Sequence, residues 1–137
     1  MEPHFKLTDI EFERQFLHCQ LPPSIFSHEA HLRLAWIHIE KYGMEQAEKN
    51  ILQQLKKYVE FAGARDKFNI TLTMAAIKAV THFWSKSGHN TFKGFISEFP
   101  QLKYNFKELM ECHYGFDIFN STKAKNTYLA PDLLPFD

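Results

Sequence analysis

The chain has 137 residues, of which 45% are hydrophobic and 15% aromatic. This composition excludes a disordered chain, and the length fits one folded domain of residues 1–137 with a real core. Sixteen basic and sixteen acidic side chains give a formal net charge of zero, so no basic surface predicts a nucleic-acid partner.

Membrane and secretory classes are not expected either. No apolar run approaches the roughly 18 residues that a membrane span needs, and the first residues do not form a signal peptide. Cys19 and Cys112 lie far apart in the sequence and form no paired motif. A reducing, cytoplasmic location with no membrane partner is therefore the expectation.

The first half of the chain predicts three helices. Thr8 and Glu11 have the spacing of a capping box and predict a helix that ends before Pro22. Ser27 and Gly43 are start and stop signals for a second helix over residues 27–42. A third helix over residues 44–62 follows directly, because its apolar residues repeat at helical spacing.

The second half also predicts helices. Residues 68–73 contain β-branched side chains that suit a strand, but the apolar pattern continues at helical period, and a lone strand would have no partner. A helix from there to Gly88 is expected, followed by helices over 91–99 and 101–114 and a short turn over 121–125. Residues 128–137 form an apolar, proline-interrupted tail. The predicted fold is all-α, an irregular single-domain bundle of about six helices with an extended apolar C-terminal tail.

The second helix carries the residues that suggest chemistry. Steps of about 100° place His28 and His31 on the stripe that should face the core, and Glu29 and Arg33 mostly on the other side. Residues three apart on a helix are neighbours, so both imidazoles can face one cavity. Three interpretations stay open: histidines satisfied by backbone or core contacts, a polar ligand pocket, or a metal site.

Other residues are candidates for the lining of the same ligand pocket. They are Asn69 and Thr73 on the fourth helix, Trp36 on the second and His113 on the last long helix. For Asn69 the simpler interpretation is that it caps the start of its helix. No inward carboxylate or thiolate accompanies the histidines, so no metal ligand and no cofactor is predicted, and tight transition-metal binding is not expected.

The order of several motifs resembles a group of small bacterial all-helical proteins of no settled function. The motifs are F-x-H-x-x-H-L-x-x-A-W, K-[FY]-x-x-T-L-T, a later His-Tyr pair and P-D-L-x-P near the end. Here they are Phe26, His28, His31, Leu32, Ala35 and Trp36; Lys67, Phe68, Thr71, Leu72 and Thr73; His113 and Tyr114; and Pro131, Asp132, Leu133, Pro135 and Phe136. The resemblance implies a shared pocket. Many of its members carry His-Glu where this chain has Asn69-Ile70, so this chain lacks two of their four potential metal ligands.

The sequence therefore predicts a small soluble helical protein with a polar interhelical pocket, lined by His28 and His31, that binds an unknown small ligand. One alternative is a metal-dependent enzyme that uses His28, His31 and His113. Another is a module for protein–protein interaction or self-association, for example as a homodimer. No reaction is predicted.

Overall fold

The computed structural model describes residues 1–136, and this part of the chain contains helices but no strand. The predicted all-α class is confirmed, including the choice of helix over strand after Phe68. Asp137, the last residue of the predicted tail, lies outside the described residues. Backbone contacts divide the chain into two compact units, residues 1–68 and the part from Asn69 onward. Each unit is described by itself.

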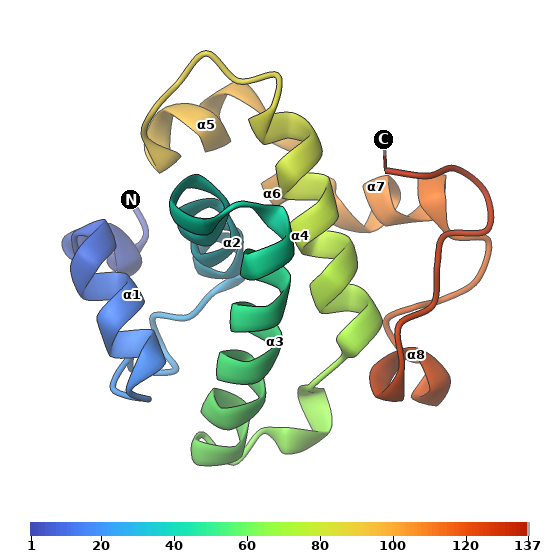
Figure 1. Ribbon diagram of the computed structural model, residues 1–137, viewed down its shortest axis with the longest axis horizontal. Coiled ribbons are helices and arrows are strands. Elements are labelled where there is room, and N and C mark those ends of the chain that lie inside the picture. The colour runs from blue at the N-terminus through green and yellow to red at the C-terminus, as the bar shows by residue number, and fades with distance from the viewer. Residues whose placement is uncertain (137) are drawn as a thin grey trace. The chain divides into compact units, whose positions relative to one another are not determined.

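The first unit contains three α-helices and two short 3-10 helices. They are η1 (Pro3–Lys6), α1 (Asp9–Leu17), α2 (His28–Tyr42), α3 (Met44–Phe61) and η2 (Arg65–Lys67). Figure 1 shows α2 running directly into α3, and these two helices form the main packing contact of the unit. The short helix η1 was not predicted, because a four-residue element has no periodicity that a sequence pattern can reveal.

The predicted helix starts and stops of this unit are confirmed. The Thr8 hydroxyl accepts a hydrogen bond from the Glu11 amide at 3.2 Å, and the Thr8 amide donates to the Glu11 carboxylate at 2.9 Å. The Ser27 hydroxyl accepts from the Ala30 amide at 3.2 Å at the start of α2. Gly43 has a φ of 83° and alone separates α2 from α3.

The core of the first unit is rich in aromatic residues. Phe12 and Phe16 of α1 are fully buried, and the Phe16 ring lies 4.8 Å from the ring of Tyr58 on α3. The Tyr58 hydroxyl donates to the Leu21 carbonyl at 2.7 Å, which holds the loop before α2 against α3. Burial of this apolar surface is the main source of stability of the unit.

The predicted orientation of α2 is wrong in part. Glu29 and Arg33, which were expected to face solvent, are each only 5% exposed, whereas His28 and His31 are exposed. The reason is that η1 packs over the Glu29–Arg33 side of α2, through contacts of both residues with His4. The apolar periodicity of the sequence does not reveal η1, so it could not predict that Glu29 and Arg33 are covered.

The second unit contains five α-helices in its described part. They are α4 (Ile70–Trp84), α5 (Phe92–Glu98), α6 (Gln101–Tyr104), α7 (Phe106–His113) and α8 (Thr122–Asn126). The helix predicted over 101–114 is divided at Asn105, whose φ of −130° and ψ of 33° are not helical. Helix α4 ends at Trp84, four residues before Gly88. The described residues thus form eight α-helices, against the six or so expected.

The tail packs against the second unit, as predicted. The Leu133 amide donates to the His113 carbonyl at 3.0 Å, and the Tyr114 hydroxyl donates to the Leu129 carbonyl at 2.9 Å. The side chain of Phe136 is buried. These contacts return the tail to the C-terminal end of α7 (Figure 1).

No helix in the described part of the chain is both long and apolar enough to cross a membrane.

Candidate functional site

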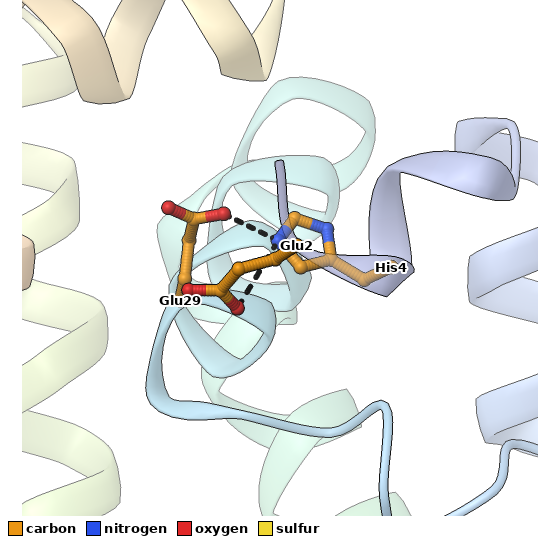
Figure 2. Close-up of side chains that lie close together, drawn as sticks. All are labelled: Glu2, His4 and Glu29. Atoms are coloured by element: carbon orange, nitrogen blue, oxygen red, sulfur yellow. Dashed lines mark hydrogen bonds and ion pairs between the residues drawn. The ribbon is translucent and has the colours of Figure 1, made fainter.

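The first turn of α2 meets the N-terminal segment of the chain in a cluster of polar side chains. Figure 2 shows the side chains of Glu2, His4 and Glu29 pointing toward one another, two from the N-terminal segment and one from α2. Each offers one potential metal-ligand atom, and these atoms all lie within 4.8 Å of one another. Among the described residues, this is the one place where three or more such side chains bring their ligand atoms close together.

The His4 imidazole is at the centre of the cluster. Its Nε2 atom lies 2.6 Å from Oε1 of Glu29 and 3.9 Å from Oε1 of Glu2. His4 is fully buried and Glu29 nearly so, while the Glu2 side chain keeps 27% of its surface exposed. The Ser27 hydroxyl, which caps α2, also donates to Oε1 of Glu2. The cluster is therefore mostly buried and reaches solvent on its Glu2 side.

Arg33, one turn after Glu29, joins η1 to α2 through hydrogen bonds. Its guanidinium donates to the His4 carbonyl at 2.6 Å and to the Leu7 carbonyl at 2.8 Å. It also donates to Oδ1 of Asp9 at 2.9 Å, and it lies 4.9 Å from the centre of the Phe12 ring. Because a guanidinium presents several donors in one plane, a single side chain satisfies all of these acceptors.

The neighbours of His4 determine where its proton lies. Nη1 of Arg33 is 3.3 Å from Nδ1 of His4, and a guanidinium can only donate, so Nδ1 is the acceptor. The proton of the neutral ring is then on Nε2, which donates to Glu29. Burial lowers the pKa of His4, against the opposing hydrogen bond to Glu29. The network therefore holds a neutral imidazole between a guanidinium and a carboxylate.

His31 has a different arrangement on the other side of α2. Its Nδ1 donates to the Ser27 carbonyl at 2.8 Å, and its ring stacks on Phe26 with 3.7 Å between the ring centres. Nε2 is therefore an acceptor with a lone pair. Desolvation lowers the pKa of His31, with the Ser27 carbonyl acting in the opposite direction. The residue is nevertheless exposed, which weakens the desolvation.

His113 is held in the same way within the second unit. Its Nδ1 donates to the Leu134 carbonyl at 2.7 Å, and its ring stacks on Phe136 with 4.0 Å between the centres. A backbone carbonyl at Nδ1 fixes the tautomer and leaves a lone pair on Nε2, an arrangement that protein ligands to metals share. His31 and His113 thus have the same local chemistry in two separate units.

The remaining predicted pocket residues have local roles. Asn69 accepts from the Leu72 amide at 2.9 Å, so its interpretation as a helix cap is confirmed, and it donates to the Ile118 carbonyl at 2.8 Å. The Thr73 hydroxyl donates to the Asn69 carbonyl at 2.7 Å. Trp36 is buried in α2. A ligand pocket shared by these residues, His28, His31 and His113 stays a prediction.

Sequence reasoning missed the Glu2–His4–Glu29 cluster. Glu2 and His4 lie in a segment with no periodicity, so no pattern identified them. For Glu29 and Arg33 a signal exists, because residues 34–39 of α2 are almost entirely apolar and a helix that is hydrophobic on all sides is buried on all sides. The side of α2 that carries Glu29 and Arg33 is therefore covered by protein, while His28 and His31 are exposed.

Two surface hollows lie away from these residues. One, of about 460 Å³, is in the second unit and is lined by both apolar side chains, such as Met110 and Phe116, and charged ones, such as Lys107 and Glu111. The other, of about 470 Å³, is in the first unit and is lined mostly by polar side chains of α3. Both are open toward solvent, and neither includes a residue of the polar cluster.

Comparison with known proteins provides no identification. The chain matches no protein-family model, no curated protein and no solved structure.

Proposed function

We propose that the chain binds a small molecule through the first turn of α2, with His31 as the residue that recognises it. The observation that carries this proposal is the hydrogen bond from Nδ1 of His31 to the Ser27 carbonyl at 2.8 Å. That bond makes Nε2 an acceptor, so the ligand is expected to present a hydrogen-bond donor such as an amine, amide or hydroxyl group.

Two further features support His31 as a binding residue. Stacking on Phe26 fixes the plane of its ring, so little side-chain freedom is lost when a ligand binds. His28 lies one turn earlier on α2, is exposed as well, and is close enough to His31 to influence its charge. The pair therefore offers two neighbouring imidazoles on one exposed helix turn.

The test compares thermal unfolding of the wild type with that of His31→Phe. The phenyl ring keeps the stacking on Phe26 and removes both nitrogens. A panel of small amines, amides and alcohols is screened, each compound beside an analogue that lacks the donor. His18→Gln, at an exposed position after α1, is the matched control.

A ligand at one hundred times its dissociation constant stabilises the folded state by about 2.7 kcal/mol. We expect at least one donor-bearing compound to stabilise the wild type and His18→Gln but not His31→Phe. The proposal is contradicted if no compound of the panel stabilises the wild type more than it stabilises His31→Phe.

The other functions expected from the sequence stay predictions. They are a metal-dependent enzyme with His28, His31 and His113, and a module for protein interaction or homodimer formation. Membership of the small bacterial helical family is likewise a proposal, supported by the motifs of the sequence alone.

A further inference from the structure

We propose that Glu2, His4 and Glu29 form a binding site for a divalent first-row transition-metal ion, for which Zn²⁺ is the probe. This site is separate from the ligand site proposed at His31. It uses the opposite side of the first turn of α2, together with the N-terminal segment. The inference departs from the expectation that the chain binds no transition metal tightly, which was argued from His28, His31 and their expected neighbours Asn69, Thr73 and His113.

Of the two distances from His4 to the carboxylates, one is shorter and one is longer than the spacing of donor atoms in a metal site. In a tetrahedral Zn²⁺ site, a histidine nitrogen and a carboxylate oxygen lie about 3.3 Å apart, as follows from bond lengths of about 2.0 Å. Here Nε2 of His4 is 2.6 Å from Glu29 and 3.9 Å from Glu2. Changes of less than about 1 Å in these two distances would therefore bring His4 to the spacing of a metal site with each carboxylate. The ligand atoms of Glu2 and Glu29 already lie within 4.8 Å of each other.

The charge and chemistry of the donors also fit. Two carboxylates and one neutral imidazole offer two negative charges to a divalent cation, while the positive charge of the adjacent Arg33 is paired with Asp9. Imidazole nitrogen and carboxylate oxygen are suitable ligands for Zn²⁺, Fe²⁺ and Mn²⁺, whereas soft ions such as Cu(I) prefer sulfur ligands. The Ser27 hydroxyl lies beside Glu2 and can support or complete the ligand set. The exposed part of Glu2 provides an entry path.

Arg33 sets the condition for binding. A metal at Nε2 requires the proton of the neutral ring to be on Nδ1, which at present accepts from Nη1 of Arg33 at 3.3 Å. That contact is the longest of the guanidinium group, whose bonds to the His4 and Leu7 carbonyls are 2.6 and 2.8 Å. Because the same Nη1 atom also donates to the His4 carbonyl, metal binding requires the guanidinium to turn so that it no longer faces Nδ1. Metal binding therefore moves the His4 proton from Nε2 to Nδ1.

The experiment is calorimetric titration of the untagged full chain with Zn²⁺, combined with ¹⁵N NMR of the histidine rings. We expect one Zn²⁺ per chain and a switch of His4 from the Nε2–H to the Nδ1–H form. Glu2→Gln is the informative variant, because the partly exposed Glu2 can be changed with little risk to the fold. It should weaken binding at least about tenfold. Glu45→Gln, at an exposed position of α3, is the matched control and should bind as the wild type does.

Four results would overturn the site. The first is the absence of Zn²⁺ binding by the wild type. The second is equal binding by the wild type and Glu2→Gln. The third is binding that leaves the His4 tautomer unchanged. Loss of binding in His31→Phe with retention in Glu2→Gln would assign the metal to the histidines of α2 and would also overturn it. Small-molecule binding at His31 is judged separately by the thermal screen.

Discussion

At the scale of single residues, the hydrogen-bond partner of each histidine decides what that histidine can do. A carbonyl next to a ring nitrogen requires a proton there, and a guanidinium requires a lone pair. His31 and His113 have carbonyls at Nδ1, while His4 has Arg33. Three imidazoles of one chain are thereby assigned to two tautomers.

These tautomers are directly measurable. We expect two-bond ¹⁵N–¹H correlation spectra of the metal-free protein at neutral pH to show His31 and His113 protonated on Nδ1. His4 should be protonated on Nε2. Spectra of His4→Gln and His31→Phe assign the signals. A His4 ring protonated on Nδ1 without metal would contradict the role given to Arg33.

The buried His38 should make the stability of the protein depend on pH. It is fully buried in α2, and burial lowers its pKa, against the effect of Glu13 and together with that of Lys41. Nδ1 lies 3.4 Å from the Asn50 amide, and Nε2 has no hydrogen-bond partner within the described residues. Because the unfolded chain binds a proton near pH 6.5 and the folded chain resists it, stability should fall as pH drops below about 6.5.

The test is urea unfolding of wild type and His38→Leu at about pH 7.5 and about pH 5.5. One proton contributes at most about 1.4 kcal/mol per pH unit. His38→Leu should reduce the loss of stability at the lower pH but not abolish it, because the pKa values of His4 and His31 are shifted in the same direction. An unchanged pH dependence in His38→Leu would exclude His38 as a contributor.

At the scale of elements, the helix boundaries were more predictable than the helix faces. Capping residues act locally, so the starts of α1 at Thr8 and of α2 at Ser27 could be predicted from a few positions. The face that a residue presents depends on all the elements that pack around it. Glu29 and Arg33 were assigned to solvent because η1, which covers them, has no sequence signature.

The junction between α2 and α3 depends on the backbone of Gly43. Its φ of 83° and ψ of 166° lie in a region that is essentially restricted to glycine. A Cβ atom at Gly43 would meet no other atom within 4 Å, so strain of the backbone is the only expected cost. We expect Gly43→Ala to lower the free energy of unfolding by about 1–3 kcal/mol.

The matched control is Gly88→Ala, where a Cβ atom also meets nothing within 4 Å and no left-handed φ occurs. It should be neutral or should stabilise the protein by up to about 1 kcal/mol. Denaturant unfolding of both variants decides the matter. Equal effects at the two positions would show that Gly43 is not held in the left-handed region.

At the scale of the whole molecule, backbone contacts divide the chain into two compact units, and the single domain expected from the sequence stays a prediction. Each unit contains one of the two tryptophans, Trp36 in the first and Trp84 in the second. Trp36→Phe keeps only Trp84, and Trp84→Phe keeps only Trp36, so each variant reports by fluorescence on one unit. If residues 1–137 unfold as one domain, the two fluorescence transitions should coincide once each is corrected for the stability of its variant. Far-UV circular dichroism of each variant provides the common reference. Separate transitions would contradict the single-domain prediction.

The candidate site was less predictable than the fold for a physical reason. The fold class follows from apolar periodicity, which is repeated along the chain and tolerates local errors. A site depends on which side chains from distant segments meet. His28 and His31 were identified because they are one turn apart on a helix. Glu2 and His4 meet Glu29 only after about 25 residues of intervening chain have folded.

The reach of Arg33 has a consequence for folding kinetics. Its acceptors on His4, Leu7 and Asp9 lie 24 to 29 positions earlier in the chain. A contact over such a distance forms after a loop has closed, and the short η1 helix has no internal stability with which to form first. We therefore expect η1 to dock after the rate-limiting step of folding. In stopped-flow experiments, Arg33→Met should unfold faster than the wild type while its refolding rate stays nearly unchanged. Slower refolding would instead place the N-terminal segment in the folding nucleus.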